Sequence, residues 1–188
     1  DRKNAVIPAF DNLAELSPDR LRSLVRETIR SWFSKTTSPH TRRAYRHDLR
    51  RFLRFTGIDE RQPELVLSVR PEQISRWRDT LLAQGLSPTS VRRKLTTMRS
   101  LFSYLQTFGY TGANPAHGKF VSAPPVPRDG KTPGLTPKQC RMLLDVPDPE
   151  TPLGIRDRAI LAVLAYSACR VGELTRLRLK DFVSVSAR

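Results

Sequence analysis

Basic side chains gather in two stretches of the sequence, and both stretches are poor in acids. Between residues 42 and 54 the single acid is Asp48, and the basic residues are Arg42, Arg43, Arg46, Arg50, Arg51 and Arg54. Between Ser87 and Leu105 there is no acid, and the candidate binding residues are Thr89, Ser90, Arg92, Arg93, Lys94 and Arg99. A guanidinium fork donates paired hydrogen bonds to phosphate oxygens. These stretches are therefore typical of a surface that binds a phosphate-bearing partner.

The elements that carry these side chains are predicted to be helices. Serine followed by proline marks three starts, at Ser17, Ser38 and Ser87, because serine caps free N–H groups and proline fits the first helical position. Apolar residues then recur every three or four positions. The pattern predicts helices over about 18–34, 39–56, 71–85 and 88–109, which together make one four-helix unit.

A stretch rich in proline and glycine, residues 115–135, cannot sustain a helix or a central strand and is predicted to be a linker. Beyond it we expect a short helix after Thr136 and an apolar helix over 154–168 that is buried on most sides. Residues 183–188 alternate like the start of a strand.

Composition limits the classes of function. The net charge of +15 favours an anionic partner, with duplex DNA the first expectation and RNA an alternative. No run is apolar enough to span a membrane and the N-terminus lacks the apolar core of a secretory signal, so we expect a soluble, cytoplasmic, nucleoid-associated protein. Cys140 and Cys169 form no disulfide framework, and no metal-ligand spacing or cofactor motif is present.

An alternative interpretation of the basic helices is that they are ordinary solvated faces. Ordinary soluble helices interleave acids with bases, however, and these two do not. If the two helices neutralise about six phosphates, the slope of log K on log salt is about −5.

Three segments resemble the phage integrase and Xer-type tyrosine recombinase family. They are Ser38 to Leu49, Gly85 to Phe102, and Gly154 to Phe182 with the box Tyr166-Ser-Ala-Cys-Arg170-Val-Gly-Glu173-Leu174. The resemblance implies a mainly α fold: a four-helix, SAM-like core-binding domain (residues 1–114), the linker 115–135, and the largely helical opening of an α+β catalytic domain (136–188). It also implies duplex DNA as partner, no cofactor, and self-association on DNA.

In this family the arginine matched by Arg170 holds the scissile phosphate, and the acid matched by Glu173 orients active-site groups. The spacing places both side chains on one helix face, although an isolated Arg-x-x-Glu would be only a surface ion pair. The resemblance thus implies an incomplete catalytic site of Arg170 and Glu173, and DNA contacts from Thr41, Arg42, Arg43, Arg46, Arg50 and the second basic stretch.

The family's remaining catalytic groups follow the first arginine, and after Arg170 this sequence has no His, Tyr or Trp. His40 and His47 each precede an arginine by three residues but lie in the predicted DNA-binding helix, and Tyr166 is expected in the core. We therefore expect a shortened, inactive chain that ends before the nucleophile, with the 154–168 helix poorly ordered or covered by a second copy. The alternative is a non-catalytic DNA-binding protein that uses the same scaffold.

Overall fold

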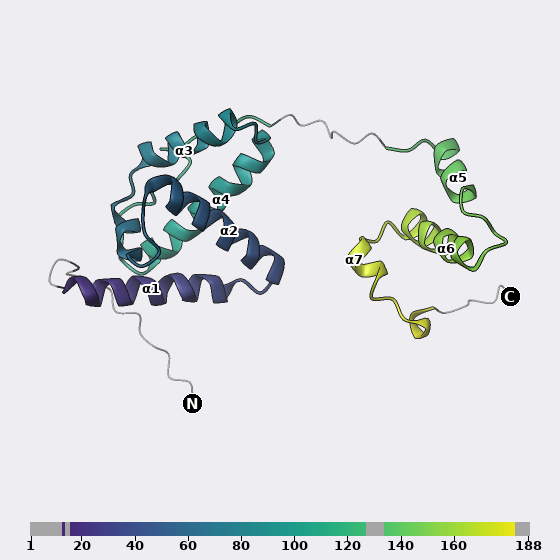
Figure 1. The fold of residues 1–188 in the computed structure, drawn as a ribbon, viewed down its shortest axis with the longest axis horizontal. Helices are drawn as coiled ribbons and strands as arrows, with labels where there is room; N and C mark the ends of the chain where they lie inside the picture. The colour runs from purple at the N-terminus through teal and green to yellow at the C-terminus, as the bar shows by residue number, and fades with distance from the viewer. Residues whose placement is uncertain (1–12, 14–15, 127–133, 183–188) are drawn as a thin grey trace. The chain divides into compact units, whose positions relative to one another are not determined.

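The computed structural model describes residue 13 and residues 16–126 and 134–182 (Figure 1). Every regular element in these ranges is helical, so the predicted mainly α fold is confirmed. The chain divides into two compact units, Asp1–Pro127 and Arg128–Arg188, and each is described by itself. The strand expected at 183–188 and the N-terminal residues judged for a signal lie outside the described residues.

Within residues 16–126, the first unit has four α-helices and one short 3-10 helix. They are α1 (Pro18–Lys35), α2 (Pro39–Thr56), η2 (Pro63–Ser68), α3 (Pro71–Ala83) and α4 (Pro88–Thr107). The three serine caps are confirmed, since the hydroxyl oxygens of Ser17, Ser38 and Ser87 each accept a hydrogen bond from the backbone N–H three residues on. The helix η2 was not predicted from the sequence.

Helix α4 forms the centre of this unit because it packs against α1, α2 and α3. Its inward side chains are fully buried: Val91, Leu95, Met98, Leu101, Phe102 and Leu105. Burial of each large apolar side chain stabilises the fold by about 1.5–3 kcal/mol. On α1, Trp32 stacks on Tyr45 of α2 with ring centroids 5.0 Å apart and donates its indole N–H to the Ser100 hydroxyl of α4. The core thus fixes α1, α2 and α4 relative to one another.

Part of the stretch predicted to be a linker packs into the first unit. Ala116 and Val121 are fully buried in the core. The Arg99 guanidinium donates to their carbonyl oxygens at 3.0 and 2.9 Å, and the Asn114 amide group donates to the Arg99 carbonyl oxygen at 3.0 Å. Proline and glycine excluded helix and strand here but did not prevent burial, so the prediction that a linker begins at 115 was wrong for this part of the segment.

The second unit contains α5 (Pro137–Asp145), α6 (Pro152–Ser167), α7 (Val171–Leu174) and the 3-10 helix η3 (Leu179–Asp181). Gly154 is required near the start of α6, because a Cβ there would lie 1.8 Å from the Asp148 carbonyl oxygen. The expectation that α6 is buried on most sides was wrong for the described chain: it is a regular helix whose Ile155 is 59% exposed. Tyr166, expected in the core, is 84% exposed.

Within the described residues no helix is long and apolar enough to cross a membrane.

Candidate nucleic-acid interface

A buried carboxylate joins the two basic helices. Asp48 of α2 is fully buried and accepts hydrogen bonds from three side chains of α4. Arg93 donates through both terminal nitrogens, at 2.7 and 2.9 Å, Lys94 donates at 2.6 Å, and the Thr97 hydroxyl donates at 2.9 Å. The one acid of the first basic stretch is therefore turned inward, and it fixes the register of α2 against α4.

The charge of Asp48 depends on these donors. Burial alone would raise the pKa of the carboxyl, but hydrogen bonds from Arg93, Lys94 and Thr97 and the nearby Lys94 charge outweigh burial and lower that pKa. Asp48 is consequently ionised at neutral pH. It neutralises the ammonium group of Lys94, whose side chain is only 7% exposed, and leaves the Arg93 side chain 48% exposed at the surface.

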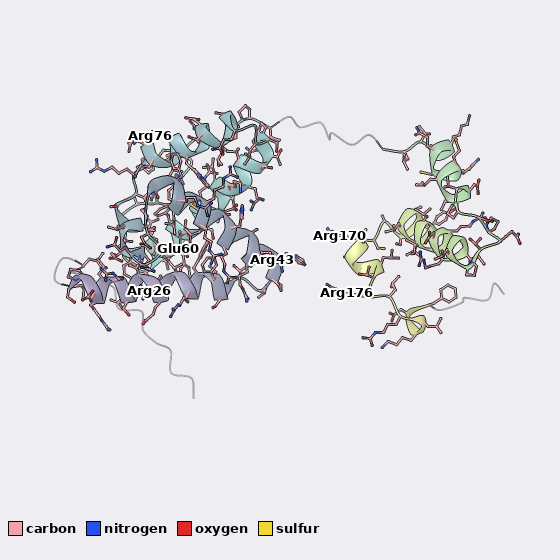
Figure 2. All side chains as sticks on the ribbon, viewed as in Figure 1. Arg26, Arg43, Glu60, Arg76, Arg170 and Arg176 are labelled. Atoms are coloured by element: carbon pink, nitrogen blue, oxygen red, sulfur yellow. The ribbon has the colours of Figure 1, made fainter. Side chains whose placement is uncertain are left out.

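Several predicted contact residues lie at the surface near the starts of α2 and α4. Thr41 and Arg43 of α2 and Thr89 and Arg92 of α4 are all exposed. Within the described residues, neither Arg43 nor Arg92 has an ion-pair partner. Figure 2 shows Arg43 near the start of α2, projecting outward from the unit. These guanidinium groups keep all their donors for an external ligand.

Ser90, also predicted as a contact, lies in the first turn of α4. It is partly buried, and its side-chain oxygen accepts a hydrogen bond from the Ser87 hydroxyl at 3.0 Å. The cap itself uses one of the free N–H groups at this helix start.

Three other predicted arginines of α2 are engaged away from the junction. Arg42 donates to the Thr36 carbonyl oxygen at 2.7 Å, across the turn between α1 and α2. The Arg46 guanidinium lies 5.5 Å from the centroid of the Phe33 ring of α1, and Arg50 pairs with Glu60 at 3.4 Å. The predicted contact residues of α2 therefore do not all lie on one surface, because Arg46 and Arg50 face α1 and η2 instead of α4.

Two predicted residues of α4 have structural partners. Lys94 is buried against Asp48, and Arg99 bridges the carbonyl oxygens of Ala116 and Val121. A buried ammonium group cannot also reach an external phosphate without breaking its ion pair. The structure thus assigns these two side chains to packing of the unit.

Arg170 and Glu173 of the second unit lie close together, as their spacing predicts. Arg170 precedes α7 and does not lie within a helix. Its terminal nitrogen lies 3.4 Å from a carboxylate oxygen of Glu173, and its backbone N–H donates to the other oxygen at 2.8 Å. The Arg170 side chain is 88% exposed, so its remaining donors are accessible. Glu173 thus accepts hydrogen bonds at the start of α7, and the side of the Arg170 guanidinium group turned away from Glu173 is exposed.

Asp48, which joins the two basic helices, was not among the predicted site residues. Its spacing was an available signal, because Asp48 follows Tyr45 by three residues and precedes Phe52 by four, which places it on the apolar side of the helix. An acid on that face requires a buried partner. Within the described residues no cluster of His, Cys, Asp or Glu could hold a metal, and both cysteines are free thiols of intermediate exposure.

Comparison with known proteins identifies the first unit. Residues 32–107 match the family model described as "Phage integrase, N-terminal SAM-like domain". Similar curated proteins include the tyrosine recombinase XerC of Thermodesulfovibrio yellowstonii, 37% identical over 147 residues, and XerD of Vibrio cholerae, 30% identical over 168 residues. The first unit therefore carries the N-terminal SAM-like domain of phage integrases, and the chain is similar in sequence to Xer-type tyrosine recombinases. The predicted resemblance to this family is confirmed, together with the SAM-like type of the helical domain.

The chain spans about half the length of these recombinases. The XerC alignment covers 78% of this chain and 46% of the relative, and the XerD alignment covers 88% and 53%. A second XerC, from Oceanobacillus iheyensis, is 36% identical over 152 residues. No solved structure matches this chain significantly.

Proposed function

We propose that this chain binds duplex DNA through α2 and α4, as the DNA-holding part of a site-specific tyrosine recombinase acting in DNA integration and recombination. The observation that carries the proposal is the Asp48 junction, which joins two basic helices and leaves a guanidinium group half exposed between them. The relatives named tyrosine recombinases support the same reading. The proposed place of action is the cytoplasmic nucleoid.

The proposed contact set is narrower than the sequence predicted. It consists of Thr41, Arg43, Thr89, Arg92 and Arg93, with the backbone N–H groups at the start of α4 favouring a phosphate through the helix dipole. Arg42, Lys94 and Arg99 support this surface from within, since each is bound to the protein itself. The proposed DNA-binding domain consists of residues 1–114 together with the segment around Ala116 and Val121 that packs on them.

The proposed role of Arg170 is to hold a DNA phosphate at the catalytic site of the recombinase, and the proposed role of Glu173 is to orient the Arg170 guanidinium group. Attack on a phosphodiester develops charge on the non-bridging oxygens, and an accessible guanidinium group stabilises that charge. Glu173 holds Arg170 from one side without covering the fork. None of the four tyrosines is proposed as the nucleophile.

Three of those tyrosines are already engaged in the first unit. Tyr45 stacks on Trp32, the Tyr104 hydroxyl hydrogen-bonds Ser31 at 2.8 Å, and the buried Tyr110 hydroxyl accepts a hydrogen bond from Thr28 at 3.2 Å. Tyr166 is exposed, but it precedes Arg170, whereas the nucleophile of the family follows that arginine. A DNA substrate that traps phosphotyrosine should therefore give no covalent adduct with this 188-residue chain, and an adduct would refute this assignment.

Fluorescence anisotropy with mixed-sequence duplexes tests the proposal. We expect binding to duplex DNA that is several hundredfold stronger at 50 than at 200 mM salt, since about five phosphates give a slope near −4.5. Changing both Arg92 and Arg93 to Ala should lower the affinity for duplex DNA at least tenfold. Equal affinity for duplex RNA of the same sequence would contradict the choice of DNA.

Self-association on DNA is a further part of the proposal. It rests on the exposed apolar side chains of the second unit, including Ile155, Tyr166 and Leu179. Sedimentation with and without duplex DNA tests it, and a single chain per duplex at all concentrations would count against it.

A further inference from the structure

A groove with an apolar floor opens in the first unit between α1, α2 and η2. Its volume is about 190 Å³. The floor is made by Ile29, Phe33, Leu49, Leu53, Pro63 and Val66. The rim carries Arg26, Arg30, Arg46, Arg50 and Glu60. Four guanidinium groups therefore surround an apolar cavity beside a single carboxylate.

The rim arginines keep donors for a ligand. Arg26 donates one hydrogen bond, to the Arg61 carbonyl oxygen at 3.1 Å, and Arg50 pairs with Glu60 at 3.4 Å. Arg30 is exposed and has no ion-pair partner within the described residues. Since each guanidinium group carries five N–H donors, most of those on the rim remain unused.

The size and lining of the groove specify what fits it. A protein cavity of about 150 Å³ accommodates a benzene molecule, so this groove holds one aromatic or large aliphatic side chain. The excess of guanidinium groups favours carboxylates on either side of that anchor. A DNA backbone fits poorly, because an apolar floor offers nothing to phosphates and Glu60 repels them.

We propose that this groove binds an acidic segment of a partner protein, with one large apolar side chain in the cavity and flanking Asp or Glu side chains on the arginines. The groove is separate from the surface proposed for DNA, so the inference does not rest on DNA binding. Arg46 and Arg50, which the sequence assigned to DNA, belong to this second surface.

Peptide binding to the full 188-residue chain tests the proposal. The probe is a fluorescein-labelled synthetic peptide with one phenylalanine between two pairs of glutamates, and the matched probe replaces phenylalanine with serine at the same charge. We expect the phenylalanine peptide to bind about tenfold to a hundredfold more tightly, as burial of one aromatic side chain requires. Equal affinity of the two peptides would overturn the proposal.

Matched charge reversals locate the binding. Arg30→Glu should lower the affinity for the phenylalanine peptide at least fivefold, whereas Arg76→Glu should change that affinity less than twofold. Figure 2 shows Arg76 on α3, on the side of the unit away from Arg26 and Glu60. Both arginines are exposed, so neither change disturbs the core. Equal effects of the two reversals would overturn the proposal.

Duplex DNA binding of the same two variants separates this groove from the DNA surface. The expected result is that Arg30→Glu and Arg76→Glu lower DNA affinity equally, through net charge alone. A larger loss of DNA affinity in Arg30→Glu would assign the groove to DNA and overturn the inference. If neither the wild type nor the variants bind DNA, the proposed DNA-binding function is refuted, whereas the peptide measurements still test the groove.

Discussion

Replacement of Asp48 by asparagine should strongly destabilise the first unit. The change removes the charge that compensates the Lys94 ammonium group, which is 2.6 Å away and almost completely buried. Breaking a buried ion pair by removing one partner costs about 3–5 kcal/mol. We expect about 3 kcal/mol, because Lys94 has a long side chain that can shift toward solvent. This loss corresponds to a fall in melting temperature of roughly 10 °C.

Urea unfolding followed by tryptophan fluorescence measures this change in the first unit alone. Both tryptophans of the chain, Trp32 and Trp77, are buried there. The control is Asp79→Asn, because Asp79 pairs with Arg78 at the surface and is 60% exposed. Exposed pairs contribute less than about 1 kcal/mol, so the control should be nearly neutral.

A second substitution tests the cause of the loss. Adding Lys94→Met to Asp48→Asn removes the stranded ammonium group and should recover part of the stability, since apolar replacements of buried ion pairs are often tolerated. If Asp48→Asn cost less than 1 kcal/mol, or if Lys94→Met lowered stability further, the assignment of Asp48 as the compensating charge would be refuted.

The difference in unfolding free energy between the wild type and Asp48→Asn should depend on pH, and this dependence tests the role of the Asp48 charge independently. The pKa of Asp48 is lowered in the folded state, so its contribution is fully present above the unfolded value of about 3.9 and is lost as pH falls through the folded pKa. The gap in unfolding free energy between the wild type and Asp48→Asn should be constant from pH 8 to 5 and shrink below about pH 4. A gap that closed between pH 7 and 5 would contradict this reasoning.

Three further outcomes follow from the structure. Arg99→Ala should lower the melting temperature by several degrees, because it frees two carbonyl oxygens that need a donor; an unchanged melting curve with weaker DNA binding would instead make Arg99 a contact residue. Arg92→Ala should leave the melting curve unchanged and reduce the salt slope of DNA binding by about one, as titration at several salt concentrations would show. Gly57→Ala should cost about 1 kcal/mol in urea unfolding, since Gly57 ends α2 with φ +72°, and a neutral result would refute the need for glycine there.

Local signals in the sequence were sufficient to predict the four α-helices of the first unit, although not the 3-10 helix η2. A cap such as Ser38 acts on N–H groups within its own turn, so the start of α2 is visible in a few letters. The apolar repeat of α4 is likewise a local signal, because helical periodicity places its apolar residues on one face, and that face is buried in the structure.

The roles of individual basic residues could not be predicted in the same way. Arg99 and Arg92 are alike in the sequence, but only the fold brings Arg99 to the carbonyl oxygens of residues 116 and 121. The burial of Ala116 in a proline-rich segment also depends on these distant contacts. The exposure of Tyr166 shows the same limit, since an apolar helix is buried only where other elements cover it.

The most direct test of the central claim is a nuclear magnetic resonance titration of the isotopically labelled chain with a short duplex DNA. Amide shifts should concentrate in the first turns of α2 and α4, around Thr41, Arg43, Arg92 and Arg93, and leave α3 around Arg76 unchanged. Shifts confined to α1 and α3, or spread evenly over the unit, would contradict the claim that the helices joined by Asp48 form the DNA-binding surface.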